Sequence, residues 1–266
     1  MKWAANLSWL YTEWPFEARL AAAAEDGFKA VECMFPYAHD IQRLRSLADE
    51  HGLQWVLINA PAGQWERGDR GLACHRARQD EFRTSMEAAL TTASTLGVKL
   101  VHVLAGAVDE THSGETAAAW DCYRENLQWL ADQTRHENVT WLIEPINRRD
   151  IPGYLLHTQE QAHGLLTDLN CDNLGVQMDL YHCQVAQGDV VRRLERYVPT
   201  GRVKHIQMAG APDRHEPDHS ELDYTFVCQV LRRLGYDGHI GLEYRPRLGT
   251  RKGLEWVRKA AFSGTM

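Results

Sequence analysis

The chain has 266 residues, of which 29 are lysine or arginine and 36 are aspartate or glutamate, so its formal net charge is −7. With 44% hydrophobic and 24% charged residues, the composition is that of a folded globular protein and excludes a disordered chain. The acidic balance argues against a nucleic-acid partner, which usually requires a basic face. The length fits two small domains or one large α/β barrel.

The six cysteines are spread along the chain without a CxxC pair. No stretch approaches the roughly 18 consecutive apolar residues that a membrane-spanning helix needs, and the first residues lack the apolar core of a secretory signal. These features predict a cytoplasmic protein with reduced, mostly buried cysteines and no membrane partner. The sequence leaves the oligomeric state open and is compatible with a homo-oligomer.

Short apolar runs alternate with longer segments of helical character along the whole chain. The runs are rich in Val, Ile, Leu and Trp, which is typical of strands buried on both faces. They recur about every 33 residues, a spacing that fits one βα unit each. They cover residues 3–7, 30–34, 55–59, 98–104, 139–144, 174–179, 203–208 and 239–244.

Helices are predicted between these runs. Residues 16–26 and 79–96 each precede a glycine, which commonly ends a helix, and apolar residues at helical spacing predict helices over 116–135 and 222–234. Eight strands, each followed by a helix and without a linker, predict one (β/α)8 TIM barrel over residues 1–266. An open doubly wound sheet is the alternative, but the first run is not followed by a glycine-rich phosphate-binding turn.

A polar residue lies at or close to the carboxyl-terminal end of each run, and four of these residues share a spacing of about one βα unit. In a barrel they would come from four consecutive strands and converge at the mouth, where the active sites of such barrels lie. Converging carboxylates repel one another unless a cation neutralises them, and an all-oxygen ligand set suits Mg²⁺, or alternatively Mn²⁺, better than Zn²⁺. Otherwise each acid would pair with an arginine or cap a helix. The four residues are Glu144, Asp179, Gln207 and Glu243.

Around these residues the chain resembles the xylose isomerase-like TIM-barrel superfamily and, within it, the hydroxypyruvate isomerases. The resemblance runs nearly end to end and implies an isomerase that uses one divalent metal ion, with Mg²⁺ as the first choice and Mn²⁺ as the second. The segments that carry it are AANLSWL, VECMFPY, PAGQWERGDRG, IEPINRRDIPGY, QMDLYHCQ, HIQMAG, PDRHEP, ELDY and IGLEYRP.

The resemblance also assigns roles to single residues. The matching Glu, Asp, Gln and Glu of the family bind the metal, which places the ligands at Glu144, Asp179, Gln207 and Glu243. Two of them, Glu144 and Glu243, would also serve as proton donor and acceptor. Related epimerases carry histidine at the position of Gln207, so the glutamine is closer to the isomerase branch.

Three further residues are predicted to contact substrate by the same resemblance. His182 and Arg214 match residues that contact substrate oxygens in related ketose epimerases, and a guanidinium at Arg214 could clamp a carboxylate with two hydrogen bonds. Asp150 stands where epimerases often have glutamate. Each of the three could instead be a rim residue that makes no contact with substrate.

Two segments exceed the usual length of a βα loop and are candidate lids. They are residues 61–74 and 209–221. Trp65 lies in the first of them, among polar residues and glycines, and is the tryptophan placed to cover a ligand. The other tryptophans are most simply explained by packing.

The implied reaction interconverts hydroxypyruvate and tartronate semialdehyde. One glutamate would remove the C–H proton of a metal-chelated 2-keto acid, the metal would stabilise the enediolate, and the other glutamate would return a proton to the adjacent carbon. A 2-oxo-tetronate isomerase and a ketose 3-epimerase are alternatives, so the partner is a small keto acid or keto sugar. An endonuclease-like barrel and a non-catalytic metal-binding barrel are different classes. The negative charge and the lack of histidine among the four ligands disfavour the endonuclease.

Overall fold

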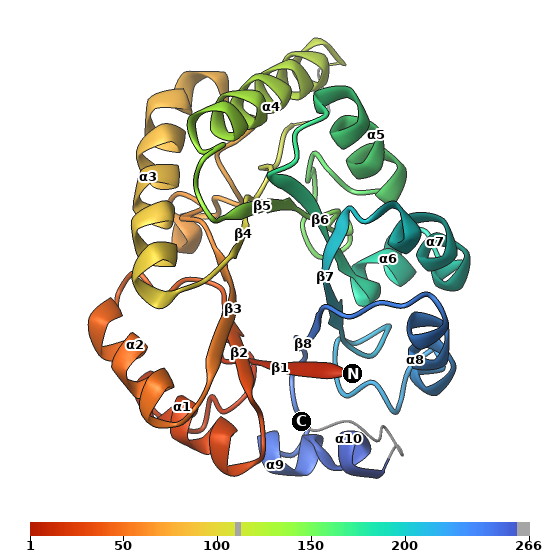
Figure 1. Cartoon of the computed structure of the whole chain (residues 1–266). Helices are drawn as coiled ribbons and strands as arrows, with labels where there is room; N and C mark the ends of the chain where they lie inside the picture. Colours follow the sequence, from red (N-terminus) through yellow and green to blue (C-terminus); the bar gives the residue numbers. More distant parts are fainter. Residues whose placement is uncertain (110–112, 260–266) are drawn as a thin grey trace.

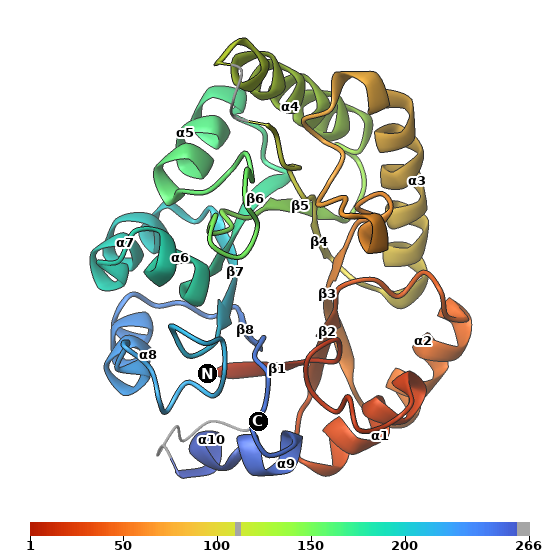
Figure 2. The same ribbon diagram turned by 180° about the vertical axis from the view of Figure 1, so that it is seen from behind.

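A computed structural model describes residues 1–109 and 113–259. Within these residues, eight parallel strands close into a barrel in the order of the sequence, and helices surround it (Figures 1 and 2). The predicted (β/α)8 fold is therefore confirmed. The strands are β1 (Lys2–Asn6), β2 (Ala30–Cys33), β3 (Gln54–Asn59), β4 (Leu100–His102), β5 (Thr140–Ile143), β6 (Leu174–Asp179), β7 (Val203–Met208) and β8 (His239–Leu242).

The helices begin and end largely where local capping groups allow it. Gly97 ends α3 with a φ of 73°, a conformation that favours glycine. Thr158 and Gln161 form a capping box at the start of α5. The side chain of Asp223 accepts the first free N–H groups of α8, which therefore begins at residue 224 rather than at the predicted 222. The helices are α1 (Phe16–Glu25), α2 (Ile41–Glu50), α3 (Gln79–Leu96), α4 (Ser113–Gln133), α5 (Gln159–Leu169), α6 (Leu180–Ala186), α7 (Val190–Tyr197), α8 (Tyr224–Arg233), α9 (Thr250–Gly253) and α10 (Glu255–Lys259), with short 3-10 turns at Trp65–Arg67, Arg76–Arg78 and Val198–Thr200.

The main hydrophobic core fills the layer between the barrel and the helices. Trp3 of β1 and Trp141 of β5 are among its largest fully buried side chains. The ring of Trp3 packs edge-on against Trp256 of α10, with 5.9 Å between ring centroids. Burial of such aromatic side chains contributes strongly to stability, so this layer fixes the strands and with them the barrel rim.

The barrel interior changes from apolar to polar along the strands. A small apolar cluster that includes Ala4, Ala30 and Leu142 lies toward the amino-terminal ends. Side chains two residues apart on a strand face the same side, so Asn6, Glu32 and the other polar residues two positions later stand above this cluster. Parallel pairing keeps them level, for example between Asn6 and Glu32. The carboxyl-terminal end of the barrel is therefore lined with polar groups.

All six cysteines are free, and five of them are buried. This agrees with the predicted reduced, mostly buried cysteines. None of the described helices combines the length and the apolar character that crossing a membrane requires.

Candidate active site

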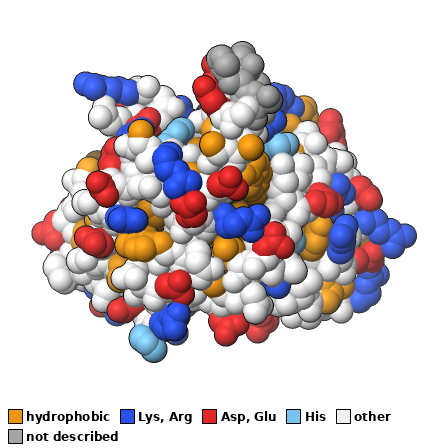
Figure 3. All heavy atoms as spheres, turned by 90° about the horizontal axis from the view of Figure 1, so that it is seen from above, with side chains coloured by type: hydrophobic (Ala, Val, Ile, Leu, Met, Phe, Trp, Pro, Cys, Tyr) orange, Lys and Arg blue, Asp and Glu red, His pale blue; other side chains and the backbone are white. Residues whose placement is uncertain are grey.

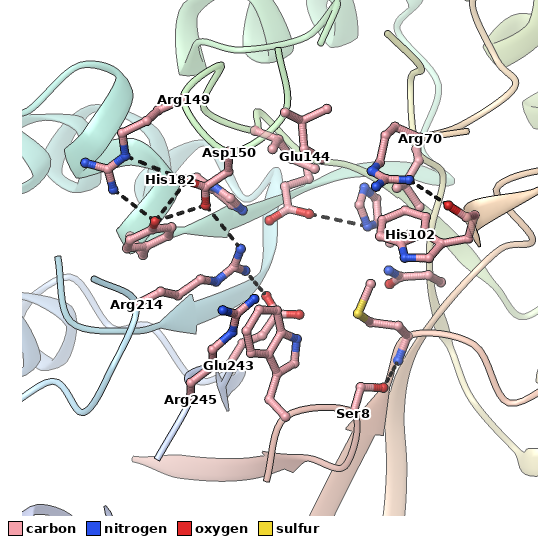
Figure 4. Close-up of a pocket in the computed structure, with 18 of the residues that line it drawn as sticks. Ser8, Arg70, His102, Glu144, Arg149, Asp150, His182, Arg214, Glu243 and Arg245 are labelled. Carbon is pink, nitrogen blue, oxygen red and sulfur yellow. Dashed lines mark hydrogen bonds and ion pairs between the residues drawn. The ribbon is translucent and has the colours of Figure 1, made fainter. Parts of the chain in front are cut away.

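A cavity of about 1070 Å³ opens at the carboxyl-terminal ends of the strands. Five of the seven predicted site residues line it (Figure 4). The other two, Asp179 and Gln207, are buried. Asp179 contacts the lining residues His182 and Arg214, whereas Gln207 bonds to Glu32 and Gln177, which do not line the cavity. The lining residues among the seven are Glu144, Asp150, His182, Arg214 and Glu243.

Glu144 follows β5 directly and is 4% exposed. Its Oε2 lies 3.4 Å from Nδ1 of His102, and its Oε1 has no hydrogen-bond partner among the described residues. Burial lowers the pKa of His102 to about 3, so this ring is neutral near pH 7 and cannot balance the carboxylate. Burial, followed by repulsion from Glu243 and Asp179, raises the pKa of Glu144 well above its usual value. Glu144 is therefore a buried acid with one oxygen directed at no protein donor.

Asp179 ends β6 and also caps α6, because its Oδ1 accepts the N–H of Tyr181 at 2.8 Å. The helix-capping alternative is thus realised, but it uses only one of the two oxygen atoms. Oδ2 lies 3.7 Å from Nε2 of His182. One carboxylate oxygen each from Glu144 and Asp179 and one ring nitrogen of His182 lie within 4.8 Å of one another. This arrangement brings together two of the predicted metal ligands and one predicted substrate contact.

The tautomer of His182 follows from its neighbour Asn147. The Asn147 Oδ1 accepts the N–H of Asp150 at 2.9 Å, which fixes the orientation of the amide. The amide nitrogen therefore donates to Nδ1 of His182, 2.6 Å away, and the ring proton sits on Nε2. Burial lowers the pKa of His182 well below its usual value, so the ring is neutral. A neutral ring with its N–H toward the site suits contact with a substrate oxygen better than metal ligation.

Glu243 follows β8 and is held at both oxygens. Its Oε1 accepts from the amide of Asn6 at 3.1 Å, and its Oε2 accepts from Nη2 of Arg214 at 2.8 Å. Burial raises the pKa of Glu243 to about 8, although Arg214 opposes the shift. The backbone of Arg214 has a φ of 59°, and this strained residue turns its guanidinium into the cavity.

Arg214 contacts more negative groups than it can neutralise. Besides Glu243, it donates to Oδ2 of Asp179 at 3.3 Å and lies 3.6 Å from Asp150. Burial alone would lower the pKa of Arg214, but the surrounding acids raise it, so the side chain is a permanent cation. Arg149, 3.7 Å from Asp150, is a second cation at the edge of the cluster.

The site therefore carries excess negative charge when its acids are ionised. Either of two events removes this excess charge: the acids take up protons, as their raised pKa values indicate, or the site binds a divalent cation. The unpartnered Oε1 of Glu144, and the carboxylate oxygens of Glu144 and Asp179 that lie within 4.8 Å of each other, fit such a cation. Oxygen donors of this kind suit Mg²⁺ or Mn²⁺.

Gln207 of β7 lies at the floor of the site, 1% exposed. Its amide nitrogen donates to Oε1 of Glu32 and its oxygen accepts from the amide of Gln177, both at 2.7 Å. An amide oxygen has two lone pairs, so the oxygen of Gln207 keeps one for another partner. The metal-binding role of Gln207 stays a prediction.

Three residues that sequence reasoning did not assign take part in the site. His102 contacts Glu144, Asn147 orients His182, and Gln177 bonds to Gln207. The signals available were weak, since His102 merely lies near the end of a predicted strand and Asn147 lies inside the segment IEPIN. Their roles depend on which side chains they meet across the barrel, and no spacing along the chain expresses that.

A model of the xylose isomerase-like TIM-barrel family matches residues 20–260. The chain belongs to this family. The 2-oxo-tetronate isomerase of Cupriavidus necator is 45% identical, and the aligned region covers 97% of each chain. The hydroxypyruvate isomerase of Escherichia coli strain K12 is 38% identical over 97% of this chain and 98% of its own. The resemblance derived from the sequence segments is confirmed, and this family member is an isomerase.

Solved structures extend the likeness. A Brucella melitensis protein described as an AP endonuclease of family 2 is 39% identical, with a TM-score of 0.92 over 97% of this chain and 98% of its own. The D-psicose 3-epimerase of Clostridium cellulolyticum H10 has a TM-score of 0.77 over 92% of this chain and 85% of its own. At 16% identity it shares the fold alone.

Proposed function

We propose that this xylose isomerase-like barrel isomerises short 2-keto acids that carry a hydroxyl group on the neighbouring carbon, with the help of a divalent metal ion. One observation carries the proposal. Two buried glutamates, Glu144 and Glu243, enter the same cavity from β5 and β8, and Asp179 lies beside them with an excess of negative charge. Such a site can hold a cation and can move a proton in both directions.

The two glutamates divide the proton transfers. One takes a proton from the hydroxyl-bearing carbon, and the other delivers a proton to the adjacent carbonyl carbon, while the proton of the hydroxyl group passes to the former carbonyl oxygen. A bound divalent ion would polarise the carbonyl group of the substrate. Asn6 and Arg214 hold both oxygens of Glu243 in place, whereas Oε1 of Glu144 is buried and has no hydrogen-bond partner among the described residues. His182, with its proton on Nε2, is positioned to donate to a substrate oxygen.

Two acids fit this reaction. Hydroxypyruvate is the substrate predicted from the sequence, and a 2-oxo-tetronate is the second candidate. The 45% identity to the Cupriavidus necator 2-oxo-tetronate isomerase, against 38% to the Escherichia coli hydroxypyruvate isomerase, favours the four-carbon acid. We therefore expect both acids to react, the longer one with the higher kcat/KM.

Proton NMR in D₂O with Mg²⁺ tests this proposal. We expect isomer formation and incorporation of solvent deuterium with both acids, and loss of both signals after treatment with EDTA. A higher kcat/KM for hydroxypyruvate would support the proposed reaction but would make hydroxypyruvate, rather than the four-carbon acid, the preferred substrate. An absence of turnover with both acids would contradict the proposed function, and free ketoses would then be tested as epimerase substrates.

Metal binding should depend on pH, because the ion must displace protons from the site. The pKa of Glu243 is raised to about 8 and that of Glu144 is also raised, so the metal-free site is protonated below these values. Affinity for Mn²⁺ should therefore rise from pH 6 to pH 8, by about tenfold per pH unit for each proton displaced. Calorimetric titrations at pH 6, 7 and 8 measure this. In Glu243→Gln the dependence should become weaker, and an affinity of the native protein that does not change with pH would contradict the prediction.

Cleavage of abasic DNA is the competing class of activity. The net charge of −7 disfavours it, and the side of the barrel over α4 shows lysine and arginine interspersed with aspartate and glutamate rather than gathered in a basic patch (Figure 3). We propose a small-molecule substrate and no nucleic-acid partner.

A further inference from the structure

Arg70 stands apart from the other arginines of the cavity. It lies in the loop between β3 and α3, is half-buried, and lines the cavity together with Trp65. Its guanidinium lies 4.1 Å from the centre of the Trp65 ring. Its Nη1 donates to the backbone oxygens of Trp65 and Asp69, at 3.0 and 2.7 Å. The stacking and the two hydrogen bonds hold the planar group in one orientation.

No carboxylate of the described residues pairs with Arg70, although Asp69 is its neighbour in sequence. Asp69 instead accepts two hydrogen bonds from Arg78, at 2.7 and 2.8 Å, and these bonds lower the pKa of its carboxyl group. Asp69 also accepts the N–H of Gln64 at 2.6 Å. Gly63 packs so closely against the Asp69 carboxylate that a Cβ atom would collide with it. The loop therefore commits Asp69 to Arg78 and leaves the charge of Arg70 uncompensated.

The remaining cavity arginines are already engaged or exposed. Arg214 faces three carboxylates, and Arg149 contacts Asp150 and the hydroxyl group of Tyr181. Arg245 is exposed to solvent, where water and salt screen its charge. With Nη1 of Arg70 bonded to backbone oxygens, the Nε and Nη2 edge has no partner among the described residues. This edge has the geometry that binds a carboxylate with two parallel hydrogen bonds.

A negatively charged substrate needs such a group in this cavity. The carboxylates that would bind the metal and transfer the proton repel the carboxylate of a substrate. The positive charge of Arg214 does not offset this repulsion, because it is shared among those carboxylates. In the view of Figure 4, Arg70 and His102 are drawn on one side of the cavity and Arg214 on the other, with Glu144 between them. A substrate whose reacting carbons lie at Glu144 can therefore direct its carboxylate toward Arg70.

We propose that Arg70, held against Trp65, binds the carboxylate of the 2-keto acid and so selects acids over neutral keto sugars. This inference rests on the proposed keto-acid isomerase function. It assigns specificity to the loop after β3, while the reacting carbons are handled by residues from β5, β6 and β8.

The test compares Arg70→Met with Arg67→Met, a matched control in the same loop whose side chain is exposed and lies outside the cavity lining. In Arg70→Met we expect the KM for the keto acid to rise about 10- to 100-fold, the range for losing a charge-assisted bidentate contact, while kcat changes by less than about threefold. Arg70→Lys, which keeps the charge but loses the fork, should fall in between. The affinity for Mn²⁺ should equal that of the native protein in all three variants.

Binding of D-glycerate, an acid that cannot isomerise, separates this inference from the proposed reaction. Calorimetry with the Mg²⁺-loaded protein should show about 10- to 100-fold weaker binding in Arg70→Met and no change in Arg67→Met. A KM and a D-glycerate affinity within twofold of the native values would overturn the role of Arg70, as would a loss of kcat at constant KM. If the native protein turned over neither acid but bound D-glycerate in an Arg70-dependent manner, the proposed isomerase reaction would be wrong. The proposed binding of a carboxylate by Arg70 would still be supported.

Discussion

Replacing Glu243 by glutamine is expected to lower kcat by about 10³-fold, the scale of a lost general acid or base. Glutamine keeps the shape of the side chain, and its oxygen can still accept a hydrogen bond from Asn6 or Arg214, but it cannot take up and release a proton. Since Arg214 retains Asp179 as a partner, the cation is not left unpaired. The NMR isomerisation assay gives the rate, and calorimetry with Mn²⁺ should show that metal still binds, although more weakly.

The matched control is Glu216→Gln. Glu216 is as buried as Glu243, with 7% against 6% exposed, but it accepts the backbone N–H of Arg247 and lies outside the cavity lining. This variant should keep kcat within about threefold of the native value, because the contacts it alters, with the backbone N–H and the guanidinium of Arg247, lie outside the cavity lining. Full activity in Glu243→Gln would rule out proton transfer between two glutamates. A similar loss in both variants would show that removing any buried carboxylate damages the fold.

Much of the fold could be predicted because each βα unit repeats the same local signals. Apolar runs mark strands buried on both faces, and their even recurrence predicts a closed barrel of parallel strands in sequence order. Element ends were less predictable, since they depend on single capping contacts. Asp223, for example, starts α8 by accepting two backbone N–H groups, and a count of apolar spacing does not include that contact.

From the sequence, only those site residues that lie at the carboxyl-terminal ends of the strands could be predicted. Glu144, Asp179 and Glu243 meet at the rim because parallel strands bring their carboxyl ends to one side. The partners of these residues were not predictable, because they come from distant strands and loops. Asn6 meets Glu243 across 237 positions of sequence, and Gln207 meets Glu32 across 175. Such contacts are set by barrel closure and register rather than by any local pattern.

Glu32→Ala is the substitution expected to destabilise the fold most, by about 3–5 kcal/mol. Glu32 is fully buried inside the barrel below the site. Its Oε2 lies 2.7 Å from Nε2 of His205, and its Oε1 accepts from Asn6 at 3.0 Å and from Gln207 at 2.7 Å. Removing the carboxylate leaves the amide nitrogen of Gln207 without its acceptor, takes one of two acceptors from the amide of Asn6, and removes the group that faces His205, in a place that water does not reach. Urea denaturation gives the change in the free energy of unfolding.

Glu17→Ala, which removes an exposed acid, should change the free energy of unfolding by less than about 0.5 kcal/mol and serves as the control. Glu32→Gln should cost less than Glu32→Ala, because its amide oxygen still accepts from Asn6 and Gln207. A loss in Glu32→Ala no larger than that in the exposed control would contradict the assignment of Glu32 as the acceptor at the centre of this cluster.

The double variant Glu32→Leu with His205→Leu separates the contribution of this cluster to stability from its contribution to the site. Replacing both members of a buried ionisable pair by apolar residues is often neutral or stabilising, so the free energy of unfolding should recover relative to Glu32→Ala. Asn6 and Gln207 would still lose the carboxylate that orients them, and with it the fixed positions of Glu243 and of the Gln207 oxygen. We therefore expect a folded protein whose kcat/KM and Mn²⁺ affinity are lower by about 10- to 100-fold, the usual effect of losing a group that orients a ligand.

Recovery of stability together with full activity would show that the polar layer below the site, formed by Glu32 and His205, does not orient the residues above it. A loss of activity in a stable barrel would show that this polar layer serves the site rather than the stability of the fold.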